Sequence, residues 1–111
     1  MNSTITFEDF AKVDLRIGTI IEVIDFPEAR KPAYKLIIDF GSLGIKKTSA
    51  QITKRYQKEN LIARQVVAIV NFPSKQIANF MSECLVLGAI EGKDVILLNP
   101  EAAVKNGCAV S

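Results

Sequence analysis

The sequence contains no histidine and no tryptophan, and only two of its 111 residues are cysteine. Histidine is the most common general base in enzymes and the most common metal ligand, so its absence disfavours most acid–base catalysis and most metal sites. Cys84 and Cys108 do not form a CxxC motif and have no other soft ligands beside them, which argues against a zinc or iron–sulfur site. The sequence therefore predicts neither a bound metal nor a cofactor.

The motifs that mark common enzyme classes are also missing. There is no phosphate-binding GxxxxGK[ST] motif, no GxSxG motif with a nucleophilic serine, and no pair of carboxylates at a diagnostic spacing. Cys84 lies in the apolar run Cys84–Leu87, where burial is expected to raise the pKa of the thiol and make it unreactive. We therefore expect a binding protein rather than an enzyme.

Long apolar segments are absent as well. No run approaches the roughly 18 apolar residues of a membrane-spanning helix, and residues 1–9 lack the charged and then apolar pattern of an export signal. We therefore expect a cytoplasmic protein without membrane insertion. With 49% hydrophobic and 23% charged residues the composition is typical of a globular protein, and the length predicts one domain, residues 1–111.

Positive charge is concentrated in one part of the chain. The net charge is only +2, but residues 30–58 contain eight basic residues and one acidic residue, whereas residues 1–29 contain two basic and six acidic residues. Such a local excess predicts an anion-binding surface. The alternative is a solvated face whose charges only keep the domain in solution.

Short aliphatic and β-branched segments separated by glycine and proline predict an all-β fold. The strand at 16–24 is expected to bend at Gly18, and the strand at 65–72, the most hydrophobic one, is expected to be central. Residues 51–61 are expected to form a helical turn or an irregular crossover. Strands are expected at residues 16–24, 34–40, 45–50, 65–72, 82–90 and 94–98, with hairpin turns at 41–44 and at Gly92.

Five short strands with a crossover between the third and fourth fit a small closed barrel better than a flat sheet, because closure removes exposed edges. The predicted architecture is a five-stranded OB-fold barrel with short helical or strand extensions at the ends. An SH3-like barrel and a small sandwich remain as alternatives. Near the start, Thr6 and Asp9 predict a capping box for a short helix whose buried stripe is Phe7, Phe10 and Ala11.

Two blocks of the sequence resemble the signatures of one family. Residues 14–20, DLRIGTI, resemble the DLRVGxI opening of the tRNA-binding OB domain, and residues 71–83, NFPSKQIANFMSE, resemble its NLxPxKxxGxxS block. The resemblance covers essentially the whole chain. That domain also occurs at the C-terminus of some methionyl-tRNA synthetases, in bacterial phenylalanyl-tRNA synthetase beta subunits, and in endothelial monocyte-activating polypeptide II.

Two further segments, residues 26–30 and 49–56, resemble the free-standing, chaperone-like members of this family, which are linked to the export of precursor proteins. This resemblance implies a cytoplasmic homodimer that binds unfolded export precursors, with contact to the protein export machinery as a further hypothesis. The alternative within the family is a structure-specific tRNA-binding module or a synthetase accessory factor. The terminal segments 1–13 and 99–111 have little core of their own and are expected to take part in dimerisation.

The second block departs from the family pattern at two places. Asn79 stands where the family usually has glycine, and Glu83–Cys84 replaces the common Gly-Met. Asparagine tolerates a positive φ better than other non-glycine residues, so we expect residue 79 to preserve the turn. Glu83 is expected to place a carboxylate beside the RNA-binding surface.

An RNA-binding barrel needs cations and hydrogen-bond donors on its concave face. Lys75 and Ser82 are candidates through the resemblance, and Lys46 and Lys47 through local charge. The full set of RNA-binding candidates is Arg16, Lys46, Lys47, Ser49, Gln51, Lys54, Arg55, Asn71, Lys75 and Ser82.

Two of these candidates have a structural alternative. Arg16 follows Asp14 closely and could pair with that carboxylate, and Asn71 could satisfy backbone groups in the loop at Pro73. In either case the side chain would serve the fold rather than a ligand.

A polypeptide-binding site needs an apolar groove with a polar rim. The candidates are large apolar residues that we expect in loops, where side chains are more often available for binding. The alternative is that they fold down as plugs of the barrel. These peptide-binding candidates are Phe26, Phe72, Ile77, Phe80 and Met81.

Overall fold

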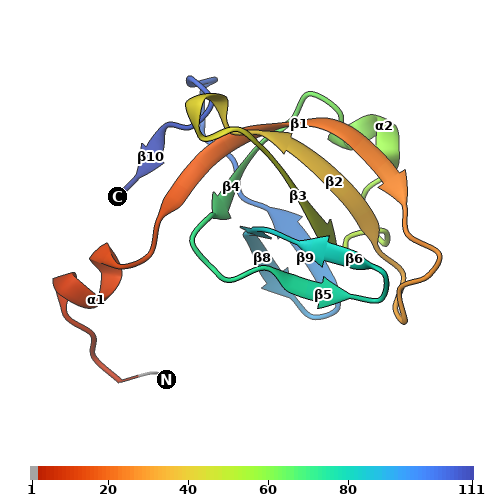
Figure 1. Ribbon diagram of the computed structural model, residues 1–111, viewed down its shortest axis with the longest axis horizontal. Helices are drawn as coiled ribbons and strands as arrows, with labels where there is room; N and C mark the ends of the chain where they lie inside the picture. Colours follow the sequence, from red (N-terminus) through yellow and green to blue (C-terminus); the bar gives the residue numbers. More distant parts are fainter. Residues whose placement is uncertain (1–2) are drawn as a thin grey trace.

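One long curved strand, β1 (Leu15–Asp25), organises the sheet (Figure 1). The computed structural model describes residues 3–111. In it, β1 pairs antiparallel with β2 (Tyr34–Asp39) along its second half, with β4 (Gln65–Ile69) along its first half, and with β10 (Ala109–Val110) at its start. The long strand is therefore the shared element of the sheet.

The sheet runs in the order β3, β2, β1, β4, β7, and every neighbouring pair in it is antiparallel. The prediction of an all-β, five-stranded OB-fold barrel is therefore confirmed. No helix within residues 3–111 is long and apolar enough to cross a membrane. The remaining elements are α1 (Phe7–Ala11), the 3-10 turn η1 (Gly41–Leu43), β3 (Ile45–Ala50), α2 (Lys58–Leu61), β5 (Lys75–Ile77), β6 (Phe80–Ser82), β7 (Leu85–Val86), β8 (Gly88–Glu91) and β9 (Asp94–Leu97).

The barrel closes between β3 and the residues that follow β6. The backbone N–H of Glu83 donates to the carbonyl of Lys47 (2.8 Å), and the backbone N–H of Lys47 donates to the Glu83 carboxylate (3.0 Å). The buried Thr48 hydroxyl donates to the carbonyl of Cys84 (2.6 Å). A mixture of backbone and side-chain hydrogen bonds thus joins the last edges of the sheet.

The core forms because strand residues alternate between the barrel interior and its outer face. In β2, Tyr34, Leu36 and Ile38 point inward and are buried, and Phe40 continues the series. Cys84 is also part of this core, as its apolar surroundings predicted. The other buried members of the cluster are Ile20, Ile52, Tyr56, Leu61, Val66, Ala68 and Leu97.

β1 is curved, as expected, but no β-bulge lies at Gly18 (Figure 1). Gly18 is in regular register with Val66, and the register shift lies between Ile20 and Glu22. Gly18 is needed for close packing instead: a Cβ at this position would lie 2.6 Å from Cγ2 of Ile38. A glycine in a strand marks either a bulge or a close approach, and here it marks the close approach.

The sequence placed several later strands incorrectly. The strand expected at 65–72 ends at Ile69, although the backbone N–H of Val70 still donates to the carbonyl of Asp14 (3.0 Å), and β4 lies inside the sheet between β1 and β7, as expected. The strand expected at 82–90 is divided among the end of β6, β7 and β8. The hairpin turn at Gly92 is confirmed, with φ +64° at that glycine.

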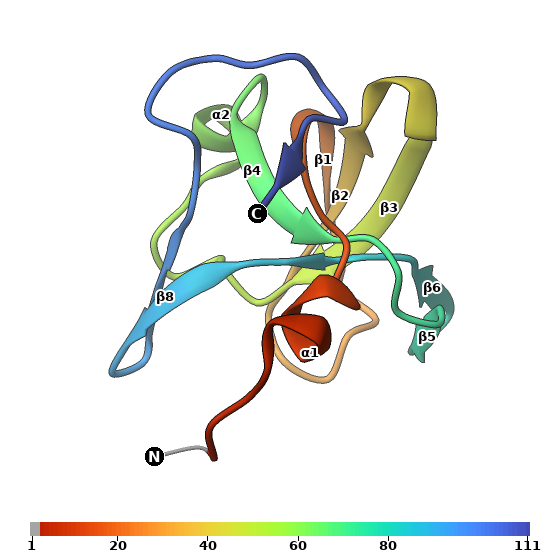
Figure 2. The ribbon, with the colours of Figure 1, turned by 90° about the vertical axis from the view of Figure 1, so that its left-hand side faces the viewer.

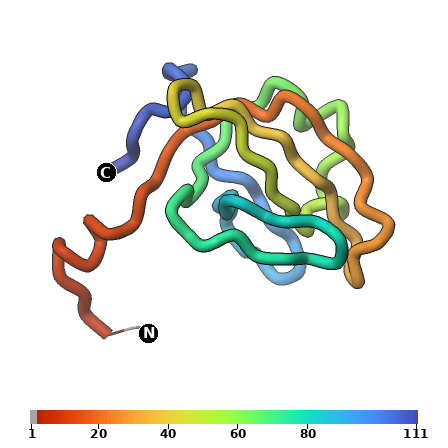
Figure 3. Tube along the Cα trace, in the orientation of Figure 1, coloured from red at the N-terminus to blue at the C-terminus, as the bar shows by residue number. Residues whose placement is uncertain are grey.

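The β5–β6 hairpin is a feature that the sequence did not predict, since residues 75–81 were expected in loops. Its two strands pair Lys75 with Ser82 and Ile77 with Phe80. The positive φ of its turn is at Ala78 (φ +53°), so the expectation that Asn79 takes this conformation is wrong. In the trace of Figure 3 the hairpin tip reaches toward the loop between β1 and β2.

The N-terminal helix α1 begins at a capping box, as predicted: the Thr6 hydroxyl accepts from the backbone of Asp9, whose carboxylate accepts from the backbone of Thr6. The predicted buried stripe is wrong. Phe7 is 81% exposed, and α1 has no buried residue. Figures 1 and 2 show α1 standing away from the barrel, on the side of the molecule where the C-terminal β10 also lies.

Candidate nucleic-acid and polypeptide interface

A groove of about 1330 Å³ opens between the loop after β1, the end of β3, the loop after β4, and β7. Its apolar lining includes Ile52, Phe72 and Val86. Exposed cations come from two directions, with Arg30 in the loop after β1 and Lys75 at the start of β5. An apolar lining with charged residues around it can accept a polymer that has both apolar and anionic groups.

Four of the RNA-binding candidates meet in this groove: Ser49, Gln51, Lys75 and Ser82. Lys75 and Ser82 are paired across the β5–β6 hairpin. The Ser82 hydroxyl lies 2.8 Å from the hydroxyl of Thr48, so it joins the hairpin to β3. The groove also takes in Phe72 and Ile77 from the peptide-binding candidates.

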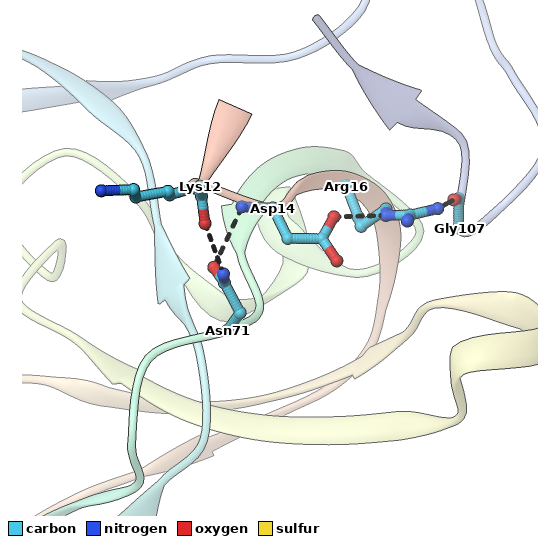
Figure 4. A network of polar contacts seen from close by, with 5 residues as sticks. All are labelled: Lys12, Asp14, Arg16, Asn71 and Gly107. Carbon is cyan, nitrogen blue, oxygen red and sulfur yellow. Dashed lines mark hydrogen bonds and ion pairs between the residues drawn. The ribbon is translucent and has the colours of Figure 1, made fainter. Parts of the chain in front are cut away.

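Arg16 does not line the groove. Its guanidinium donates to the Asp14 carboxylate (2.6 Å) and to the carbonyl of Gly107 (3.1 Å), as Figure 4 shows. The structural alternative for Arg16 is therefore confirmed. The side chain ties the start of β1 to the C-terminal segment.

Asn71 also serves the fold, although not in the way that was expected. Its side-chain amide donates to the carbonyl of Lys12 (2.7 Å) and its oxygen accepts from the backbone of Asp14 (3.0 Å; Figure 4). These groups belong to the segment before β1 and not to the loop at Pro73. Asn71 therefore fixes the point at which the N-terminal segment leaves the barrel.

Arg55 forms an ion pair with Asp94: its Nε and Nη2 both donate to the Asp94 carboxylate, at 3.0 and 2.5 Å. This pair raises the pKa of Arg55 and lowers the pKa of Asp94, chiefly through the hydrogen bond between them. Lys46 and Lys54 do not line the groove. Of the six predicted cations, Lys75 thus lines the groove, whereas five do not: Arg16, Lys46, Lys47, Lys54 and Arg55.

A second, smaller core lies under the β5–β6 hairpin. It is built on Phe26 and Phe80, which are 3% and 9% exposed and whose ring centres are 5.5 Å apart in an edge-to-face arrangement. The ammonium group of Lys35 lies 4.8 Å from the centre of the Phe26 ring, and that of Lys47 lies 5.2 Å from the centre of the Phe80 ring. Phe26 and Phe80 are therefore buried in this small core, and the ammonium groups of Lys35 and Lys47 lie over their rings.

Several residues of this surface were not among the predicted candidates. Lys35, over the two rings, and Arg30 and Lys31, at the groove, belong to the basic run at residues 30–58. For Lys35 the signal was available, since alternation in β2 places it outward between the buried Tyr34 and Leu36. The arginine and lysine before Pro32 lie in a loop, where no periodicity indicates direction.

Large apolar side chains are exposed around the groove. Phe72 is 51% exposed and Leu85 is 47% exposed, and both line it. Met81 is 42% exposed but does not line the groove. Within residues 3–111 no three histidine, cysteine, aspartate or glutamate residues gather as a metal site would require.

The thiol of Cys84 lies beneath the groove and is 6% exposed. Burial raises its pKa to about 11, and the neighbouring ammonium group of Lys46 only partly opposes this effect. The predicted burial of this thiol is therefore confirmed. A group that stays protonated at neutral pH is not a nucleophile.

Comparison with known proteins bears on what this surface does. Residues 15–109 match the family described as "Putative tRNA binding domain". The chain is 38% identical over 106 residues to methionine–tRNA ligase of Thermococcus onnurineus and 40% identical over 106 residues to that of Pyrococcus furiosus, in each case over 96% of this chain. It spans only 14% of the length of these ligases.

Two solved structures match the chain over nearly its whole length. The chaperone CsaA from Bacillus anthracis has a TM-score of 0.94 and 55% identity, covering 98% of this chain and all of that one. The CsaA chaperone protein from Picrophilus torridus has a TM-score of 0.92 and 55% identity, covering 97% of this chain and all of that one. The chain therefore belongs to the tRNA-binding domain family, as a CsaA-like member.

Proposed function

We propose that this chain is a cytoplasmic, homodimeric chaperone-type protein that captures unfolded export precursors in the groove. The observation that carries the proposal is the exposed Phe72 beside the apolar lining and the cations Arg30 and Lys75. An unfolded chain presents apolar side chains and backbone groups together, and such a groove accepts both. The similarity to the CsaA chaperones supports the same function. The proposal includes delivery of the bound precursors to the protein export machinery.

The proposed dimer of this single domain, residues 1–111, is supported by the exposed apolar residues of its terminal segments. Ile5 and Phe7 are 63% and 81% exposed, and the C-terminal β10 lies on the same side of the molecule (Figure 2). A second copy would cover these apolar side chains and bring two grooves into one particle, which strengthens weak binding through effective concentration. Residues 1 and 2 of the expected N-terminal dimer segment lie outside the described residues.

A second function, tRNA binding, is favoured by the distribution of charge. The ion pairs of residues 3–111 involve Lys12, Arg16, Arg55 and Lys58, so Lys35, Lys46, Lys47 and Lys75 have no carboxylate partner within 4.0 Å in that part of the chain. Cations without internal partners are available for phosphates. If tRNA binding is its function, the chain acts as a structure-specific tRNA-binding module or a synthetase accessory factor.

One comparison separates the two functions. The purified protein is titrated with bulk tRNA and, separately, with a permanently unfolded polypeptide, at 50 and 200 mM salt. The variants are Phe72→Ala and Lys75→Ala. Leu43→Ala and Lys105→Gln are their matched controls, because neither residue lines the groove. Phe80 is not used, because its truncation would open the small core.

The chaperone function predicts polypeptide binding that is weakened by Phe72→Ala and is little affected by salt. The tRNA function predicts binding that falls with Lys75→Ala and with salt; contact with about four phosphates gives a loss of roughly 50- to 150-fold between the two salt concentrations. Absence of polypeptide binding in the unchanged protein would contradict the chaperone function. A salt-independent interaction with tRNA would contradict a phosphate-binding surface.

A further inference from the structure

Two ammonium groups are held over the same aromatic ring on the outer face of β2 and β3. The Lys35 nitrogen lies 5.3 Å from the centre of the Phe80 ring, in addition to its contact with Phe26, and the Lys47 nitrogen lies 5.2 Å from that centre. Within residues 3–111 neither nitrogen has a carboxylate oxygen within 4.0 Å. Neither ammonium group is therefore in an ion pair within this part of the chain, although the Glu83 carboxylate accepts a hydrogen bond from the backbone N–H of Lys47 (3.0 Å).

The fold explains why both side chains occupy this place. In the pairing of β2 with β3, Lys35 lies opposite Ser49 and Lys47 lies opposite Ile37, so the two lysines emerge from the same face of the ladder. Phe80 arrives from β6 beside β3. The ring faces attract the cations and restrict their side chains, so less rotational freedom is lost when a ligand binds.

An ammonium group has three N–H donors, and contact with a ring face leaves donors directed elsewhere. Two such groups at one ring, neither with a carboxylate oxygen within 4.0 Å, can donate to the same oxyanion. At the groove, Ser49, which is paired with Lys35, adds a neutral hydroxyl and Lys75 adds a further ammonium group. A series of donors of this kind fits a polyanion better than the single carboxylate of an acidic side chain.

We propose that Lys35 and Lys47 form a subsite for one backbone phosphate of RNA, and that Phe26 and Phe80 are positioning residues that hold the two ammonium groups. The proposal rests on the tRNA-binding part of the proposed function, and it specifies which side chains contact a phosphate of the RNA. It gives the two phenylalanines a role other than contact with a bound polypeptide. Lys35 becomes a ligand-binding residue in addition to Lys47.

The test measures the affinity for bulk tRNA at several salt concentrations. Lys35→Gln and Lys47→Gln are each expected to weaken binding roughly 5- to 10-fold at 50 mM salt and to reduce the slope of log affinity against log salt, by about 0.7 to 0.9 in total when both lysines are replaced. Lys35→Arg is expected to restore binding, because arginine keeps the charge and also stacks on aromatic faces. Lys105→Gln, on the C-terminal segment away from this face, should leave the slope at the wild-type value and serves as the control.

The positioning role is tested with Phe80→Leu, which keeps an apolar side chain in the small core. It is expected to weaken tRNA binding a few-fold in the otherwise unchanged protein and to have no further effect when Lys35 and Lys47 are both glutamine. The same loss in both backgrounds would show a merely structural role and overturn this assignment. The thermal midpoint of each variant is measured in parallel to confirm that it is folded.

Two competitors identify the chemistry that is recognised. Inorganic polyphosphate, which has phosphates but no bases, should displace tRNA from the unchanged protein more effectively than from Lys35→Gln. An unfolded polypeptide should bind both proteins equally. A salt slope that is unchanged in Lys35→Gln while the unchanged protein binds tRNA would refute the subsite alone. Loss of polypeptide binding in Lys35→Gln would assign the site to acidic peptides, and absence of all tRNA binding would refute the tRNA function with it.

Discussion

Lys47 and Glu83 exchange two hydrogen bonds at the seam of the barrel, one from backbone to backbone (2.8 Å) and one from the Lys47 N–H to the Glu83 carboxylate (3.0 Å). The carboxylate thus occupies the position of a carbonyl that a regular ladder would supply. The residue that departs from the family pattern is therefore part of the closure. The Glu83 carboxylate accepts a hydrogen bond within the fold, although it lies beside the surface expected to bind RNA.

Replacing Glu83 tests this closure. Glu83→Ala leaves the backbone N–H of Lys47 without its partner and is expected to lower the free energy of unfolding by about 1–3 kcal/mol. Glu83→Gln keeps an oxygen acceptor and is expected to lower it by less than about 1 kcal/mol. Both are measured by denaturant unfolding. Equal stabilities of the alanine variant and the unchanged protein would contradict the role of the carboxylate.

Gly18→Ala tests the close packing of β1 on β2. The added methyl group would lie 2.6 Å from the Ile38 side chain and 2.7 Å from the ring of Phe40, both fully buried. Overpacking of this kind is expected to cost about 1–3 kcal/mol of the free energy of unfolding. The unfolding midpoint in urea reports the change. A midpoint at the wild-type value would mean that Gly18 is not required for packing.

The turn of the β5–β6 hairpin offers a stabilising change. Ala78 has φ +53°, a conformation that costs a non-glycine residue about 1–2 kcal/mol, so Ala78→Gly is expected to raise the free energy of unfolding by about 0.5–1 kcal/mol after the entropy of glycine is subtracted. Asn79→Gly is the matched control in the same turn and is expected to bring no gain, because its φ is not positive. Thermal unfolding measures both variants, and a larger gain at residue 79 would contradict the assigned turn.

The Cys84 thiol makes stability depend on pH in the alkaline range. Burial raises its pKa from the ordinary value of 9.0 to about 11 in the folded chain, so over this range the folded state keeps a proton that the unfolded state loses. The contribution is therefore present below pH 9 and is lost between pH 9 and 11, by up to roughly 2–3 kcal/mol. The difference in unfolding free energy between the unchanged protein and Cys84→Ala isolates it from lysine titration. A difference that stays constant over this range would refute the buried thiol.

Strand alternation explains how much of the fold could be predicted from the sequence. Tyr34, Leu36 and Ile38 alternate with polar or less buried neighbours, and the strand they predict is present in the structure. The β5–β6 hairpin was missed because its turn, Ala78–Asn79, has no glycine to mark it. The stripe that begins with Phe7 has the period of a buried helix face, but periodicity does not say whether another element covers that face.

The candidate site was predicted in part, for a similar reason. Lys75 and Ser82 belong to a motif, and the hairpin places them opposite each other. Arg16 and Arg55 carry the right charge, but each forms an ion pair within the fold, Arg16 with Asp14 and Arg55 with Asp94. Asp94 is far from Arg55 in the sequence, so that pair could not be predicted. Composition identifies a basic segment, whereas only the folded chain shows which of its cations remain without a carboxylate.

The most direct test of the account is to map where an unfolded polypeptide binds, by following backbone amide chemical shifts of the protein during a titration. We expect shifts concentrated at the groove, around Phe72, Lys75 and Leu85, with the η1 turn, which does not line the groove, unchanged. Shifts concentrated on that turn, with the groove residues unmoved, would contradict the claim that the groove captures polypeptides.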